Sequence, residues 1–161
     1  ALEMKHFRED YQKAVVNNAK SFAKSLYSKG IPVEGGEEDG FTKTHQVVIR
    51  VKKFGDGKEI ATRLEQNNII VNFQALPDDE TFYHPSGIRM GVSEMTRFGM
   101  NGEDFETLSE IMADIIINNK NKKGDVENLR KKFTKMRFSF DEESSKGIYR
   151  KLIESIFGNF L

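Results

Sequence analysis

The chain has 161 residues, enough for one domain with its own core, and its 25 lysines and arginines balance 25 aspartates and glutamates. A formal net charge of zero argues against a nucleic acid or a membrane surface as a partner held by a general basic field. No apolar run approaches the roughly 20 residues of a membrane span. With no cysteine and only three histidines, we expect no disulfide, thiolate or metal site.

The chain opens with ALEMKHFRED, which has no signal-peptide pattern. A cytoplasmic setting is therefore the default expectation. Because these first residues already favour a helix, we expect the chain to be a fragment of a longer one.

Apolar residues at helical spacing predict a long first helix over residues 3–28, ended by Lys29-Gly30. Alternation predicts a strand at 46–52, and Asp56 is a plausible N-cap for a helix at 57–66. The later predicted elements are short strands in IIVN and GIRMGV, a turn of helix from Ser93 or Thr96, and helices at 101–119, 124–136 and 145–157.

This order predicts an α/β domain, in which a small mixed or antiparallel sheet is covered by helices on one side and preceded by a long linking helix. The first helix has more apolar positions than a lone surface helix needs, among them Phe7, Tyr11 and Val15. We expect this stripe to pack partly against something outside the chain.

Several polar groups are candidates for chemistry. Asp78-Asp79-Glu80 could bind a hard cation, but the run follows a proline in a predicted loop and is better interpreted as solvated turn acids. His45 opens a strand and His84 precedes an arginine motif. A structural or solvated histidine is the safer interpretation of each.

The arginine motif is HPSGIRMG, in which Arg89 lies inside a segment that predicts a short buried strand. A guanidinium in such a place needs an anion. That anion is either a carboxylate of the protein, which is the commoner case, or the carboxylate of a substrate held bidentately. Composition leaves both alternatives open.

The segment PSGIRMGVSEMTRFGM closely resembles the S-G-I-R-x-G-(x)4-T-R-x-G motif of serine hydroxymethyltransferases, also called glycine hydroxymethyltransferases. Further matches follow the same order along nearly the whole chain: DYQKAVVNNAKSFAKSLYSKGIPVEGG, THQVVIRV, IATRLEQNNIIVNFQALP and GMNGEDFETLSEIMADII. A lone GIR would be weak, but this series at the right spacing is specific. The wording Glu94-Met95-Thr96-Arg97 is similar to that of archaeal members.

The resemblance implies a transferase of fold type I that uses pyridoxal 5'-phosphate to interconvert serine and glycine as a homodimer. This chain resembles its carboxy-terminal small domain, so residues 1–30 would be the linking helix from a large domain and residues 31–161 the small domain. The family's cofactor lysine lies in a T-T-H-K-T-like segment that does not occur here. The chain alone is therefore expected to be inactive, with no catalytic residue of its own.

By the same resemblance, Arg89 grips the α-carboxylate of the amino-acid substrate, and Gln74, Ser86 and Gly87 belong to a loop on the side of a reduced pterin. Gln74 stands where the family usually has asparagine, and Val92-Ser93-Glu94 departs from the usual T-P-A. Tetrahydrofolate and tetrahydromethanopterin both remain open as the one-carbon carrier.

Two alternatives remain beside this reading. A threonine or β-hydroxy-amino-acid aldolase of the same fold needs the same arginine and no pterin, so contact of loop 72–86 with a pterin would discriminate. A non-catalytic α/β ligand-binding module is the alternative from another class.

Overall fold

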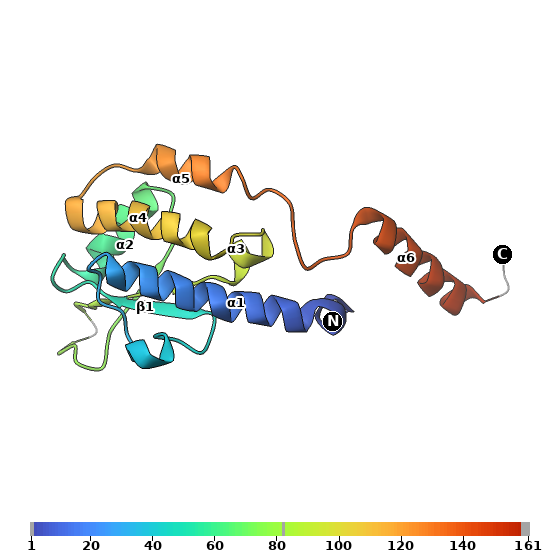
Figure 1. The fold of residues 1–161 in the computed structure, drawn as a ribbon, viewed down its shortest axis with the longest axis horizontal. Coiled ribbons are helices and arrows are strands. Elements are labelled where there is room, and N and C mark those ends of the chain that lie inside the picture. Colours follow the sequence, from blue (N-terminus) through green and yellow to red (C-terminus); the bar gives the residue numbers. More distant parts are fainter. Residues whose placement is uncertain (1, 82, 159–161) are drawn as a thin grey trace.

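The protein, described here by a computed structural model over residues 2–81 and 83–158, is a layered arrangement of helices and a small sheet (Figure 1). The helices are α1 Leu2–Ser28, α2 Gly57–Gln66, α3 Ser93–Arg97, α4 Gly102–Asn118, α5 Lys123–Arg130 and α6 Glu142–Phe157, with a 3-10 turn, η1, at Glu37–Asp39. The strands are β1 Gln46–Arg50, β2 Asn72–Gln74 and β3 Gly87–Gly91. The predicted α/β order of elements is confirmed.

The sheet is antiparallel, with β3 in the centre and the order β1-β3-β2. Five residue pairs join β1 to β3, whereas three join β2 to β3. Val33 forms an isolated bridge with Ile49, so the chain before β1 also runs along its outer edge. The edge strand β2 is therefore the least extensively paired part of the sheet.

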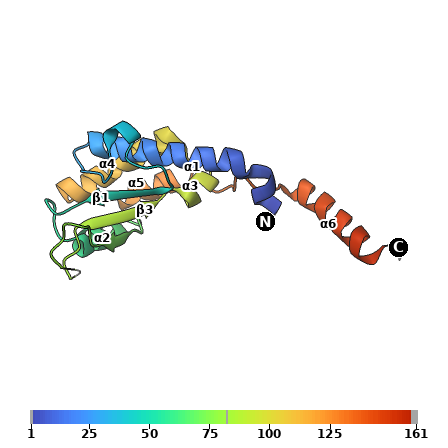
Figure 2. The ribbon, with the colours of Figure 1, turned by 90° about the horizontal axis from the view of Figure 1, so that it is seen from below.

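One face of the sheet forms a single core with α1, α2 and α4. Alternation places Val47 and Ile49 of β1 and Ile88 and Met90 of β3 on that face, and all four are buried. The helix residues of the same core include Phe22, Leu26, Ile60, Leu64, Phe105, Met112 and Ile115. The α1 helix packs along α4 and β1, and α2 packs against β2, β3 and α4 (Figure 2). Helices thus cover this face, and the other face is left for polar side chains.

The helix starts follow from local capping. Asp56 accepts a hydrogen bond from the N–H of Lys58 and so begins α2 at Gly57, as predicted. Asn101 and Asp104 form a capping box at the start of α4. None of the helices among the described residues combines the length and the apolar character that crossing a membrane requires.

The apolar stripe of α1 is partly covered by the chain itself. Val15 is buried in the core. The ring of Phe7 lies 5.3 Å from that of Phe140, and the ring of Tyr11 lies 5.3 Å from that of Phe138. The segment after α5 thus covers part of the stripe. Phe7 and Tyr11 stay partly exposed, so the expected partial packing against something outside the chain stays a prediction.

Several other boundaries differ from the prediction: β1 ends at Arg50 rather than 52, and α6 begins at Glu142 rather than 145. The strand expected at 69–72 begins only at Asn72, because Asn68 is left-handed at φ 63° and the N–H of Ile69 still bonds to the oxygen of Leu64. The α5 helix ends at Arg130 rather than 136. The last helix, α6, extends away from the rest of the fold beyond an extended segment (Figures 1 and 2).

Candidate functional site

Arg89 lies in the middle of β3 with its side chain on the face of the sheet away from the core. Its neighbours Ile88 and Met90 are buried, and Arg89 is exposed. Across the described ranges, 2–81 and 83–158, no residue forms a hydrogen bond or an ion pair with Arg89. The strand is therefore buried on one face only, and the alternative of an arginine paired with a carboxylate inside the fold is wrong.

A second arginine on the same face has the opposite environment. Arg50 of β1 lies opposite Gly87, so it is a diagonal neighbour of Arg89 across the two strands. Its Nη1 lies 2.6 Å from Oδ2 of Asp78, and its Nε forms an ion pair with Glu34. Donating hydrogen bonds to Asp78 and, second in size, to Glu34 raises the pKa of Arg50 above its ordinary value. Two carboxylates thus neutralise Arg50 and leave Arg89 as the free cation of this pair.

The cross-strand neighbours of Arg89 are Val48 on one side and Asn72 on the other. Asn72 is exposed, and Gln74, two residues further along β2, is half-buried on the same face. Residue types alone did not single out Asn72. Its place beside Arg89 depends on the register of β2 against β3, which the bounds of a predicted strand do not specify.

The loop between β2 and β3 is held more tightly than expected. Asp79 accepts hydrogen bonds from the backbone N–H groups of Leu76 and Ser86, and Asp78 pairs with Arg50. Asp78 and Glu80 are exposed, as the interpretation of solvated turn acids expects, but Asp79 is half-buried and its carboxylate is bonded to the backbone of the loop.

Ser86 and Gly87, the other residues expected on the pterin side, are buried at the base of this loop. The oxygen of Ser86 accepts the N–H of Val51, and a Cβ on Gly87 would lie 2.7 Å from Cδ2 of Leu76. Both residues therefore position the backbone before Arg89, while Gln74 is left with a side chain on the exposed face.

The two histidines lie at opposite edges of this region. His45 is exposed, its backbone oxygen accepts the N–H of Val92, and its Cδ2 would lie 3.5 Å from a Cβ placed on Gly91. His84 is exposed with Nδ1 3.4 Å from Oδ2 of Asp56. These contacts agree with the structural or solvated roles expected for both.

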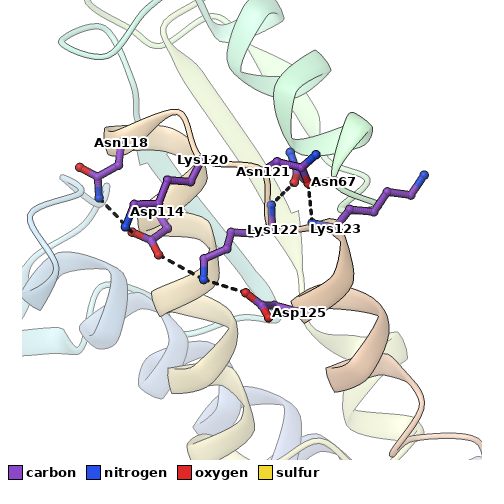
Figure 3. A network of polar contacts seen from close by, with 8 residues as sticks. All are labelled: Asn67, Asp114, Asn118, Lys120, Asn121, Lys122, Lys123 and Asp125. Carbon is purple, nitrogen blue, oxygen red and sulfur yellow. Dashed lines mark hydrogen bonds and ion pairs between the residues drawn. The ribbon is translucent and has the colours of Figure 1, made fainter.

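A polar network elsewhere in the fold ties the end of α4 to α5 and α2 (Figure 3). Asp114 accepts hydrogen bonds from Lys120 at 2.9 Å and Asn118 at 3.0 Å, and Lys122 pairs with it at 3.4 Å. These contacts lower the pKa of Asp114 to about 2, and the hydrogen bond from Lys120 is the largest cause. Asn67 accepts the backbone N–H of Lys122 at 2.6 Å. Shifted pKa values often mark functional sites, but here protein partners account for the shift, so the network clamps the helices together.

No group of three or more His, Asp or Glu side chains suited to a metal ion occurs within the part of the chain that the structure describes. The exposed sheet face around Arg89 is therefore the candidate site. It offers an unpaired guanidinium, two side-chain amides and a neighbouring apolar residue, a set that suits a small anion with further polar groups.

Comparison with known proteins extends this description. A family model for serine hydroxymethyltransferase matches residues 2–112. The chain belongs to the serine hydroxymethyltransferase family. The resemblance seen in the GIR motif and the segments around it is thereby confirmed.

Curated serine hydroxymethyltransferases are similar over most of this chain. The protein of Archaeoglobus fulgidus is 45% identical over 150 residues, which are 90% of this chain and 34% of the relative. That of Metallosphaera sedula is 46% identical over 144 residues, 88% of this chain and 32% of the relative. The chain thus spans about a third of the length of the curated relatives it matches.

Among solved structures, the L-threonine transaldolase from Pseudomonas fluorescens matches with a TM-score of 0.76 at 30% identity. The match covers 92% of this chain and 35% of that protein. The predicted fold class, a small α/β domain similar to part of a fold-type I pyridoxal-phosphate enzyme, is confirmed.

Proposed function

We propose that this chain is the part of a serine hydroxymethyltransferase that supplies the substrate-carboxylate site, and that Arg89 is its anion-binding residue. The full-length enzyme would interconvert serine and glycine, with a reduced pterin as one-carbon carrier. The observation that carries the proposal is the unpaired, exposed guanidinium of Arg89 beside an Arg50 that two carboxylates already occupy.

The chemistry of a guanidinium fits this role. Its planar fork can donate two parallel hydrogen bonds to the two oxygens of an α-carboxylate. Two parallel bonds fix the rotation of the carboxylate as well as its position, so the rest of the amino acid is oriented relative to the sheet. Position on β3, paired on both sides, keeps the Arg89 backbone rigid during binding.

The amides beside Arg89 suit the second reactant. Gln74 and Asn72 each carry one donor and one acceptor group, and pterins present ring nitrogens and an oxygen that can bond to both. We assign them to the pterin side of the site. Tetrahydrofolate and tetrahydromethanopterin share these ring atoms, so only a comparison of the two carriers in an assay would separate them.

Pyridoxal phosphate supplies an electron sink for the carbanion at Cα when it is bound. The guanidinium of Arg89 is assigned here to the substrate carboxylate, and no lysine of a T-T-H-K-T-like segment is present. The groups that hold the cofactor would therefore come from outside this chain, and its own residues bind and orient the amino acid.

Further features of the full-length protein follow from family membership and stay proposals. They are a homodimer, a cytoplasmic location, and a division into a linking helix at residues 1–30 and a small domain at 31–161. The match to a threonine transaldolase favours one alternative, a pterin-independent aldol reaction of a β-hydroxy amino acid at the same arginine.

The test is serine kinetics of Arg89→Ala and Arg89→Lys in the full-length enzyme, with Arg150→Ala on the exposed α6 as the matched control. Loss of a charge-assisted bidentate contact is expected to cost about 2–5 kcal/mol, or roughly 1.5 to 3.7 orders of magnitude in kcat/KM. The lysine variant should fall between wild type and alanine, because it keeps the charge and loses the fork.

Folding should survive both substitutions, because Arg89 has no protein carboxylate to leave unpaired. Wild-type kinetics in Arg89→Ala would refute the proposal. Retro-aldol cleavage of threonine without any dependence of serine turnover on a pterin would favour the aldolase instead.

A further inference from the structure

One carboxylate of the β2–β3 loop bonds to the loop's own backbone at both ends. Oδ2 of Asp79 accepts the N–H of Leu76 at 2.8 Å and the N–H of Ser86 at 2.8 Å. Leu76 lies two residues after β2, and Ser86 immediately precedes β3. A single oxygen atom therefore closes the base of the loop across the two strands.

The short strand β2 needs such a closure. It is an edge strand with only three residue pairs, and its residues are exposed or half-buried. Burial therefore specifies its register weakly. A slip of one residue would turn the side chains of Asn72 and Gln74 to the other face of the sheet.

The central strand does not depend on this closure to the same degree. Five pairs with β1 hold β3 in place, including the pair of Val48 with Arg89. The direction of the Arg89 side chain is thus fixed from the β1 side. The loop closure instead determines which side chains of β2 lie next to Arg89.

We propose that Asp79 is a positioning residue whose carboxylate fixes the register of β2 against β3 and so keeps Asn72 and Gln74 beside Arg89. The inference rests on the proposed function of Arg89. Gly87 supports it, because a Cβ there would lie 2.9 Å from the oxygen of Gln74, so the strands approach closely in this register. The Ser86 side chain and the two backbone N–H groups also lower the pKa of Asp79, which keeps the acceptor ionised.

The test compares Asp79→Ala and Asp79→Asn in the full-length enzyme, with Glu80→Gln as the matched control. Glu80 is the adjacent, exposed carboxylate, and it has no partner among the described residues. Amide exchange at Leu76 and Ser86 and in β2 reports the closure, and serine kinetics with the pterin report the site.

In Asp79→Ala we expect faster exchange of these amides and a loss of about tenfold to a hundredfold in kcat/KM, the scale of a displacement near 1 Å. Asp79→Asn keeps an oxygen that can accept both N–H groups, so it should recover most of the activity. Glu80→Gln should match wild type in both measurements.

Arg89→Ala, measured in the same panel, separates the two hypotheses. If it lowers activity while Asp79→Ala loosens the loop and leaves the kinetics unchanged, the positioning role is overturned and the proposed function stands. If Arg89→Ala is fully active, both fall. If Asp79→Ala does not fold, Asp79→Asn decides, because impaired kinetics with a closed loop would show that charge rather than register matters.

Discussion

The exposed face of the sheet carries two arginines whose surroundings differ. Arg50, at one end, bonds to Asp78 and Glu34, and its side chain is 38% exposed. Arg89, one diagonal step away, is exposed and has no protein partner in the described parts of the chain. Arg50 is therefore the arginine whose charge is balanced by protein carboxylates. Arg89 is the one whose guanidinium is available to a ligand.

The comparison also shows why the pairing is selective. Asp78 reaches Arg50 because the loop that contains it is closed at its base by Asp79. The same loop offers no carboxylate to Arg89. Because Arg50 is neutralised while Arg89 is free, this pair of arginines presents one open anion site rather than two.

Among changes to the surroundings of the two arginines, the largest effect is expected from giving Arg89 a protein partner like those of Arg50. Val48 lies directly opposite Arg89 on the same face, so Val48→Glu places a carboxylate within its reach. In the full-length enzyme, KM for serine should rise about tenfold to a hundredfold, equivalent to roughly 1.4–2.7 kcal/mol of lost binding. Steady-state serine kinetics measure it.

The control for this variant is Val48→Gln, which has nearly the same shape and no charge. It should leave KM within a small factor of wild type. If the two variants raise KM equally, the effect is steric, and the contrast between a free and an occupied arginine does not explain substrate binding.

The next largest effect is expected from adding a Cβ atom at one end of the exposed sheet face. A Cβ on Gly87, opposite Arg50, would lie 2.7 Å from Leu76, whereas a Cβ on Gly91 would meet only His45 at 3.5 Å. Gly87→Ala should therefore lower the free energy of unfolding by about 1–3 kcal/mol, as overpacking does. Gly91→Ala should be nearly neutral. Urea denaturation of both variants checks this, and equal losses would mean that the two ends are equally crowded.

Patterns in the sequence predicted the parts of the fold that are set locally. The α2 helix begins after Asp56 and spans 57–66, as predicted, and the alternation around Ile88 and Met90 places both in the core. The arginine motif singled out Arg89, whose role stays a proposal, and the buried strand expected there is buried on one face only. Capping and alternation act over a few residues, so they can be read without the fold.

These local patterns could not predict contacts between segments that are distant in the sequence. The partners of Arg50 come from residues 34 and 78, and the rings that cover α1 come from the segment after α5. The place of Asn72 depends on a register that three pairs and one aspartate fix. Such contacts follow from tertiary packing and loop closure, which the spacing of residue types does not encode.

A smaller effect is expected from removing Arg50. Arg50→Met keeps much of the apolar stem and leaves Glu34 and Asp78 without their cation. Because all three groups are partly exposed, the cost should be about 1 kcal/mol or less in the free energy of unfolding. Serine kinetics should stay at the wild-type value, opposite to Arg89→Ala, and a large loss of activity would place Arg50 in the site. Chemical denaturation and kinetics on one preparation give both numbers.

The smallest effect lies in how stability depends on pH. Hydrogen bonding to Arg50 lowers the pKa of Asp78, and contacts led by Lys120 lower that of Asp114 to about 2. A carboxylate whose pKa is lower in the folded state stabilises the fold above its unfolded pKa, here 3.8, and that contribution is lost as pH falls through the folded value. Urea denaturation between about pH 5 and pH 2 should therefore show falling stability in the wild type.

The two arginines should differ in this measurement too. In Arg50→Met the pKa of Asp78 returns toward its ordinary value, so part of the loss below pH 4 should disappear. Arg89→Ala should follow the wild-type curve, because no carboxylate of the described chain depends on Arg89 for its ionisation. A flatter curve in Arg89→Ala would reveal a protein acid that pairs with Arg89 in solution. Arg89 would then resemble Arg50, and its availability to a substrate carboxylate would have to be abandoned.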